Sequence, residues 1–183
     1  ACENLLSNIE RRAAINGDED RFPRISDLFA ALPAVMGKIE LVYEGEQEGP
    51  NIVAVSIIGE AVRTVFDKIF PPPRVEKRQT VVAEKSPKLP EDSPYEAVID
   101  YFSSGRRLEI SDEMSYADYR RSLNEVAGLR EIVEKYHKVS DDHELLLYME
   151  FVLEGLHRRN IIAKESPDNK FVYADMIQRI LRS

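Results

Sequence analysis

Few residues in this chain of 183 residues have the types and spacings that chemistry requires. A nucleotide site of the P-loop kind needs GxxxxGK followed by Ser or Thr, so that backbone amides, a lysine and a hydroxyl contact the phosphates and magnesium. The one Gly-Lys pair, Gly37-Lys38, has Leu32 where the first glycine should stand and Ile39 where the hydroxyl should stand. The sequence therefore predicts no phosphate-binding loop.

Two acidic groups of residues are candidates for a metal site. The turn EGEQEG, Glu44 to Gly49, offers hard oxygen donors but lacks the ligand spacing of a calcium loop, so a solvated turn is the favoured interpretation. The second group consists of His137, Asp141, Asp142 and His143. It could form a metal cluster, but it straddles a predicted helix start, where acidic residues complement the helix dipole. We favour the helix start.

The other candidates also have structural explanations. His157 stands beside Arg158 and Arg159 at a predicted helix end, where positive charge complements the exposed carbonyls. Six tyrosines recur at helical spacings, which predicts the edge of a core: Tyr95, Tyr101, Tyr116, Tyr119, Tyr136 and Tyr148. No nucleophile, base and orienting acid suggest a triad. We predict no catalytic, cofactor-binding or metal-binding residue, and no enzyme activity of this chain alone.

Composition narrows the class of protein. Hydrophobic residues make up 43% of the chain and charged residues 32%, which predicts a packed core under a highly charged surface. The formal net charge of -8 disfavours nucleic acid and anionic lipid as partners. Cys2 is the single cysteine, and no apolar run fits a signal peptide or a membrane span, so we expect a cytoplasmic setting and no membrane partner.

Helices are predicted for most of the first 70 residues. Apolar side chains share one helical face over residues 1–15, and Ser26 is expected to cap a short helix. Residues 38–43 fit either a strand or a helix. Residues 51–70 are nearly all apolar outside one polar stripe, which consists of Ser56, Glu60, Arg63 and Asp67. We expect a helix that exposes this narrow stripe and buries the rest.

Residues 92–183 predict a second group of helices. Three serines are expected to cap them: Ser93, Ser115 and Ser140. The longest helix is expected from Asp141 to about Arg159. A strand is expected at 107–110, a hairpin near 161–173, and a final helix from about Asp175.

A proline-rich stretch, residues 71–91, divides the chain. Its first three residues, Pro71 to Pro73, cannot continue a helix, and it carries more basic than acidic residues, whereas both flanks are acidic. We predict a mainly α fold with two compact domains, 1–70 and 92–183, each with its own core, joined by a basic linker.

Several segments resemble one protein family. The run RISDLFAALPAVMGKIELVYEGEQEG, Arg24 to Gly49, with the following helix that ends FDKIF, resembles a region of bacterial AAA+ proteins of the magnesium-chelatase I-subunit and MoxR type. In that group a helix like ENLLSNIERRA, Glu3 to Ala13, comes first, the segment Gly37 to Glu40 matches GK[IV]E, and a late segment resembles EFVLEGLHRRN, Glu150 to Asn160. The resemblance covers most of the chain, on packing signatures without catalytic content.

The resemblance implies that residues 1–70 form the helical lid of an AAA+ ATPase and that residues 92–183 form an extension. The core with its Walker motifs would lie upstream, as would the sensor arginine of the lid, so no catalytic residue is transferred. ATP and magnesium are expected for the full-length protein, and its core domain and neighbouring subunits are the expected partners. Arg11 and Arg12 could approach a nucleotide or a neighbouring subunit, but solvated or paired arginines are the favoured interpretation.

Two hypotheses follow. The first is a non-catalytic lid and interaction domain that couples ATP-driven motion to protein contacts. The alternative is an independent helical adaptor, winged-helix-like and able to bind nucleic acid, because such a domain also places a helix before a hairpin. The basic residues near the predicted hairpin are Arg158, Arg159, Lys164 and Lys170. Charge favours the first hypothesis, because acidic residues surround these residues in sequence and leave no extended basic face.

Overall fold

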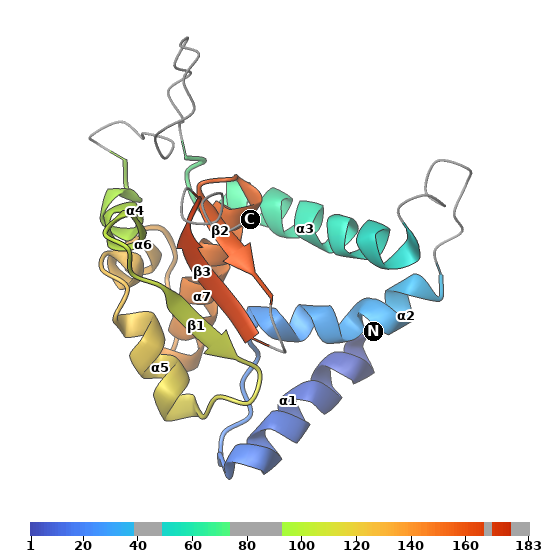
Figure 1. Ribbon diagram of the computed structural model, residues 1–183. Coiled ribbons are helices and arrows are strands. Elements are labelled where there is room, and N and C mark those ends of the chain that lie inside the picture. The colour runs from blue at the N-terminus through green and yellow to red at the C-terminus, as the bar shows by residue number, and fades with distance from the viewer. Residues whose placement is uncertain (39–48, 74–92, 167–169, 177–183) are drawn as a thin grey trace.

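The computed structural model describes residues 1–38, 49–73, 93–166 and 170–176. This part of the chain is mainly helical with one small antiparallel sheet, which confirms the predicted fold class (Figure 1). The elements are α1 (Cys2–Asn16), the 3₁₀ helix η1 (Ile25–Ala31), α2 (Leu32–Met36), α3 (Gly49–Ile69), α4 (Glu96–Ser103), β1 (Leu108–Ser111), α5 (Tyr116–Asn124), α6 (Leu129–Tyr136), α7 (Asp142–Arg158), β2 (Ile162–Glu165) and β3 (Lys170–Asp175).

Two predicted helix ends are confirmed in atomic detail. Helix α1 ends at Gly17, whose φ of 67° is left-handed and favours glycine, and whose amide donates to the carbonyl of Ala13. Helix α5 begins after Ser115, whose hydroxyl oxygen accepts a hydrogen bond from the Asp118 amide at 3.2 Å. Local sequence therefore fixes these two ends.

Three other predicted caps are wrong by one to two residues. Arg24, not Ser26, is at the N-cap position of η1, because the Asp27 carboxylate accepts from the Arg24 amide at 2.7 Å. Helix α4 starts at Glu96 after Tyr95, not after Ser93.

The third is at α7. There the Asp141 carboxylate accepts from the Glu144 amide at 2.8 Å, and the predicted cap Ser140 instead donates its hydroxyl to the Glu144 carboxylate at 2.6 Å. Because Asp141 directly follows Ser140, the helix starts one residue later than predicted.

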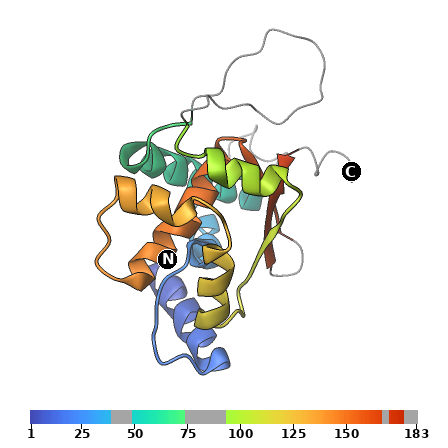
Figure 2. The same cartoon turned by 90° about the vertical axis from the view of Figure 1, so that its left-hand side faces the viewer.

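The predicted hairpin and strand belong to one sheet. Strands β2 and β3 form the hairpin, and β1 pairs with the other edge of β3, so the order is β1-β3-β2 with every pair antiparallel. Leu108 lies opposite Tyr173, and Ala163 opposite Ala174. Helices α4 to α7 lie on one side of this sheet (Figure 2). The predicted final helix falls almost entirely outside the described residues.

One hydrophobic core runs through both predicted domains. Helix α3 packs along α7, where Phe66 and Phe70 contact Phe151 at ring-centroid distances of 6.1 and 6.3 Å. Phe22 and Val62 belong to the same buried cluster as side chains of α4 to α7. The described parts of both flanks therefore contribute to one buried cluster, and the division into two domains stays a prediction. The proposed linker, 71–91, lies almost wholly outside the described residues, so its character also stays a prediction.

Helix α3 is exposed over much more of its surface than predicted. Its polar stripe is at the surface, but so are apolar side chains beside it: Ile52, Ile57 and Val65 are 57%, 52% and 45% exposed. Figure 1 shows the reason, because α1, η1 with α2, and α3 run side by side and project from the rest of the molecule. Among the described residues, α3 meets α2 and α7 with one of its sides.

Candidate functional site

The predicted candidates for a metal cluster lie near one another in sequence but turn to different partners. Asp141 caps α7, and Asp142 accepts from the Tyr116 hydroxyl at 2.7 Å. The His137 ring packs on the Tyr148 ring, with their centroids 3.8 Å apart. The His143 ring stacks on the Phe22 ring, with their centroids 5.2 Å apart. Within the described ranges, no three His, Cys, Asp or Glu side chains are placed to hold a metal ion. The acidic turn at 44–48 lies outside those ranges.

His157 does not act as the positive charge at the end of α7. Burial lowers its pKa, and its ring nitrogen Nδ1 lies 3.3 Å from the carbonyl oxygen of Ile162, to which Nδ1–H donates. Arg158 pairs with Glu154 at 2.8 Å, and Arg159 pairs with Asp67 on α3. Arg159 therefore ties the end of α7 to α3, whereas Arg158 pairs within α7.

Arg12 is the first member of a buried ionic junction. Its guanidinium makes a two-pronged contact with the Asp27 carboxylate, at 2.5 and 3.0 Å, and donates to the carbonyl of Phe22 at 2.8 Å. The two side chains are 2% and 0% exposed. Arg11, at the surface, pairs with Asp112 at 2.6 Å. Both arginines are paired, which is one of the two favoured interpretations of the sequence. The ion pair between Arg12 and Asp27 joins α1 to η1.

The junction continues into the C-terminal part of the chain. The Arg24 guanidinium donates to the carbonyls of Ser111 and Met114, at 3.2 and 2.6 Å, and lies 4.3 Å from the centre of the Tyr119 ring. From the other side, Glu150 on α7 accepts from the Ile25 amide at 2.8 Å and from the Tyr119 hydroxyl at 2.7 Å. We define the ionic junction as five buried residues: Arg12, Arg24, Asp27, Tyr119 and Glu150.

A second buried carboxylate lies one helical turn further along α7. Glu154 is fully buried and binds the Lys164 ammonium at 2.6 Å and the Arg158 guanidinium at 2.8 Å. The Tyr173 hydroxyl donates to it at 3.3 Å. Lys164 is only 5% exposed, so this cluster fastens the hairpin to α7. Desolvated charges are retained only when paired in this way.

The pKa values of the two buried glutamates are shifted in opposite directions. Burial raises the pKa of Glu150, and the hydrogen bond from Tyr119 and the charges of Lys164 and Arg24 only partly offset it. Burial also acts to raise the pKa of Glu154, but Lys164 and Arg158 outweigh it, so that pKa is lowered. Within the part of the chain that the structure describes, one oxygen of Glu150, Oε1, has no hydrogen-bond partner. The two pKa shifts differ in direction because Glu154 has two direct cationic partners, Lys164 and Arg158, whereas Glu150 has none among the described residues.

These shifts predict opposite pH dependences of stability. Above the ordinary pKa of 4.5, folded Glu150 retains its proton more than the unfolded chain does, so its ionisation costs stability as pH rises. Below 4.5, Glu154 must be protonated against its partners, so stability is lost as pH falls. Urea unfolding of wild type and Glu150→Gln from about pH 4 to 7 should show the variant gaining relative stability as pH rises.

Glu154→Gln is the matched control on the same helix. Its deficit relative to wild type should shrink as pH falls below 4.5, because protonation removes the same charge from the wild-type protein. A pH dependence of the same sign in both variants would contradict the assignment of the two shifts.

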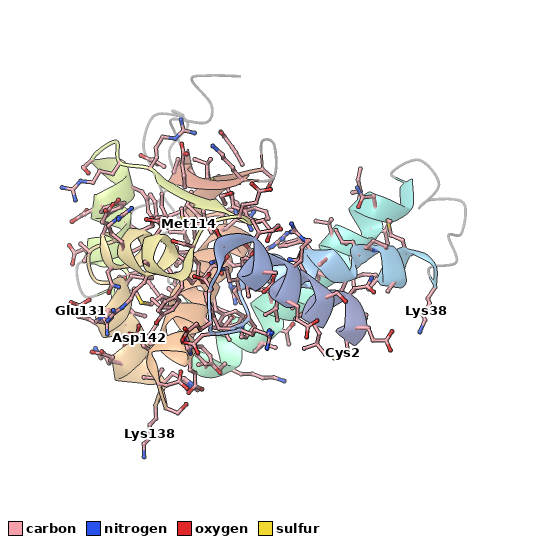
Figure 3. The ribbon with its side chains drawn as sticks, turned by 90° about the horizontal axis from the view of Figure 1, so that it is seen from below. Cys2, Lys38, Met114, Glu131, Lys138 and Asp142 are labelled. Carbon is pink, nitrogen blue, oxygen red and sulfur yellow. The ribbon has the colours of Figure 1, made fainter. Side chains whose placement is uncertain are left out.

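A second feature is an apolar surface at the projecting end of the helices. We define the apolar tip as α2 together with residues 49–58 of α3. No residue of α2 is buried, and within 49–58 Ala54 is the one buried side chain described. Neither segment contains a charged residue. Figure 3 shows α2, which ends near Lys38, far from the body that contains Met114 and Asp142.

Sequence reasoning missed both the junction and the tip as sites. A signal for the junction existed, because Glu150 and Glu154 interrupt an apolar stripe four residues apart and therefore face the core. The tip gave no such signal, since an apolar helix face predicts burial whether or not the covering element is in the chain.

No helix in the described part of the chain is both long and apolar enough to span a membrane. No protein-family model, no curated protein and no solved structure matches this chain.

Proposed function

We propose that this chain is the non-catalytic C-terminal portion of a magnesium-chelatase-like AAA+ ATPase, and that it couples ATP-driven motion to contacts with subunits or partner proteins. In this proposal α1 to α3 are the lid, and the sheet with α4 to α7 is the interaction domain. The ATPase core, ATP and magnesium belong to the full-length protein. The chain alone is not an enzyme, and its expected location is the cytoplasm.

The ionic junction is the observation that carries the proposal. A coupling element must move as one piece with the parts that it connects, and buried charged groups that each contact several fixed partners hold those partners in one geometry. Arg12 and Asp27 fix α1 to η1, while Arg24 and Glu150 fix η1 to β1 and α7. A displacement of the lid helices would therefore be transmitted to the sheet.

The apolar tip supports the second half of the proposal. Exposed, contiguous apolar surface on a water-soluble domain is typical of a protein-binding site. Along α3 the stripe of Ile57, Ala61 and Val65 continues from the tip, because residues four apart share a helical face. In the proposal, this surface packs against the ATPase core or a neighbouring subunit.

The proposal predicts that one charge at the tip abolishes docking. The longer reading frame should encode Walker A and Walker B motifs upstream, and its ATPase part, produced separately, should bind this chain. Ile57→Glu should weaken that binding by at least about tenfold, because an unpaired carboxylate would be desolvated in the contact. Ile57 is 52% exposed, so the melting temperature should change little. Surface plasmon resonance and circular dichroism measure the two quantities.

Arg63→Gln is the matched control, since Arg63 lies on the same helix and pairs only with Glu60 at the surface. It should bind like wild type. Equal binding by Ile57→Glu and Arg63→Gln would reject the tip as the contact, and an upstream frame without Walker motifs would reject the proposal. Micromolar binding of ATP and magnesium by this chain alone, measured by calorimetry, would also overturn it.

The alternative is a nucleic-acid-binding adaptor of the winged-helix type, and the order of β1, α7, β2 and β3 permits it. In such a domain the helix before the hairpin enters the major groove. Here residues 145, 146 and 149–156 of that helix, α7, are all buried. Arg158, Arg159 and Lys164 are also paired with carboxylates. A gel shift with duplex DNA at about 150 mM salt tests the alternative, and salt-dependent retention would support it.

A further inference from the structure

A pocket of about 550 Å³ lies on the outer side of α5 and α6, away from the ionic junction and the apolar tip. We call it the arginine pocket. Three of its six lining side chains are cationic and none is acidic: Tyr116, Ala117, Arg120, Arg121, Asn124 and Arg130. On a chain with a formal net charge of -8, such a lining is unexpected, and it calls for an anionic ligand.

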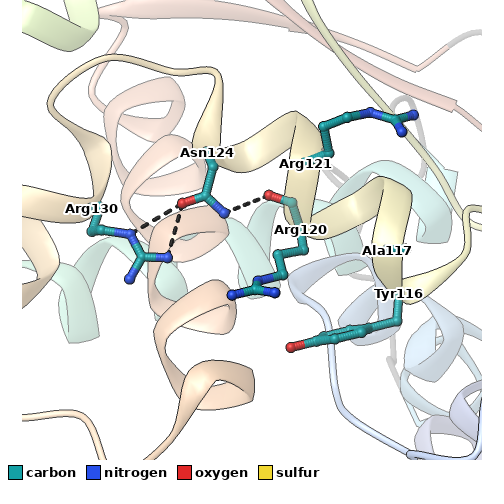
Figure 4. A pocket seen from close by; sticks show the side chains of 6 residues that line it. All are labelled: Tyr116, Ala117, Arg120, Arg121, Asn124 and Arg130. Carbon is teal, nitrogen blue, oxygen red and sulfur yellow. Dashed lines mark hydrogen bonds between the residues drawn. The ribbon is translucent and has the colours of Figure 1, made fainter.

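Two of the arginines are held in place by contacts that leave donors available. The Nε of Arg120 lies 2.9 Å from the Asp142 carboxylate, and the two terminal nitrogens of Arg120 make no hydrogen bond within the described residues. Asn124 accepts from Nε and Nη2 of Arg130, at 3.1 and 2.9 Å. Figure 4 shows the Arg120 guanidinium in the space between Arg130 and Tyr116, whereas Arg121 points away.

The acidic neighbours do not close this site. Asp118 pairs with Arg121 at 2.5 Å, and Glu134 lies 3.5 Å from Arg130. Asp142 contacts both other arginines, at 2.9 Å from Arg120 and 3.8 Å from Arg130. None of these carboxylates lines the pocket. The lining of the pocket is therefore positive, although the three arginines and the three carboxylates beside them carry equal and opposite formal charges. Asp142 serves to orient Arg120 and is itself fixed by the Tyr116 hydroxyl.

We propose that the arginine pocket binds a small oxyanion, a phosphate or a carboxylate group, through the guanidinium groups of Arg120 and Arg130. Guanidinium matches both groups because its planar donors meet two oxygens at once. This binding activity is independent of the lid function proposed above. Because Arg120 is 54% exposed and Arg130 35%, we expect a dissociation constant on the order of 1 mM for a simple dianion.

The test titrates the whole chain with inorganic phosphate and, separately, with succinate, at low ionic strength. Amide resonances recorded by ¹H–¹⁵N NMR should shift at residues 120–124 and 130, and added sodium chloride should reverse the shifts. Tighter binding of phosphate would assign a phosphorylated ligand, and tighter binding of succinate a carboxylate ligand. Absence of saturable shifts at these residues with either anion would overturn the proposal.

Variants locate the site. The double variant Arg120→Gln with Arg130→Gln should bind at least about tenfold more weakly, since two charged contacts are removed. Arg63→Gln, which removes an exposed arginine of α3, should bind like wild type. Asn124→Ala keeps all three arginines but frees Arg130, so it should weaken binding by a smaller factor and covers the case in which the double variant does not fold. Equal affinity in wild type, Asn124→Ala and the double variant would refute the assignment.

Discussion

Replacing Asp27 by alanine is expected to lower the free energy of unfolding by about 3–5 kcal/mol, because it removes the carboxylate that the buried Arg12 guanidinium contacts at 2.5 and 3.0 Å. Among the described carboxylates, Arg12 then keeps only the longer contact with Asp112, at 3.6 Å. Arg12 is 2% exposed, so water cannot take the place of the carboxylate without opening the contact between α1 and η1. The Arg24 amide loses its acceptor as well. The chain contains no Trp, so urea unfolding is best followed by circular dichroism of the helices.

The double variant Arg12→Met with Asp27→Leu tests whether the loss comes from the orphaned charge. Replacing both members of a buried pair by apolar side chains is often close to neutral, so the double variant should be more stable than Asp27→Ala. A single variant that loses less than about 1 kcal/mol would mean that the junction is not desolvated as described.

The sequence predicted the elements well because their signals are local. Helix α1 is set by an apolar face and a glycine at position 17, and α5 by the hydroxyl of Ser115. The hairpin is set by two β-prone runs. The pairing of β1 with β3 was not predicted, because residues 108 and 173 come together only through the packing of the helices between them.

The junction escaped prediction for the same reason. Arg12 fits a solvated or paired arginine on a helix, and Arg24 precedes a helix, so neither position predicts burial. Their contacts with Asp27, Ser111 and Met114 bury them. For helix α3 the error was the opposite one, because more burial was predicted than the structure shows. Its apolar residues predict burial on nearly all sides, yet the described chain supplies a neighbour along only one side. Hydrophobic patterns identify a surface that must be covered, but not the molecule that covers it.

Gly155→Ala should destabilise the protein by about 1–3 kcal/mol, although alanine is the better helix former by about 1 kcal/mol. An added Cβ at this position of α7 would lie 2.1 Å from Cδ2 of Phe66 and 2.6 Å from its Cγ. The Phe66 ring is fully buried and packs among Phe70, Tyr95 and Phe151, so it has no room to move. Helices α3 and α7 would have to separate, and a larger residue such as leucine should cost more.

Gly59→Ala, at the same helix crossing but on α3, separates the clash from the change in helix propensity. Its added Cβ would meet the end of the Arg158 side chain, at 2.5 Å from Nη1. That guanidinium is the end of a flexible side chain at the edge of the core, 19% exposed, and it can shift while Lys164 keeps Glu154 paired. Helix propensity should then dominate, and thermal unfolding should show Gly59→Ala at least as stable as wild type while Gly155→Ala melts at a lower temperature. Equal losses in both variants would show that the crossing tolerates no added methyl group on either helix, and that Phe66 is not the particular obstacle.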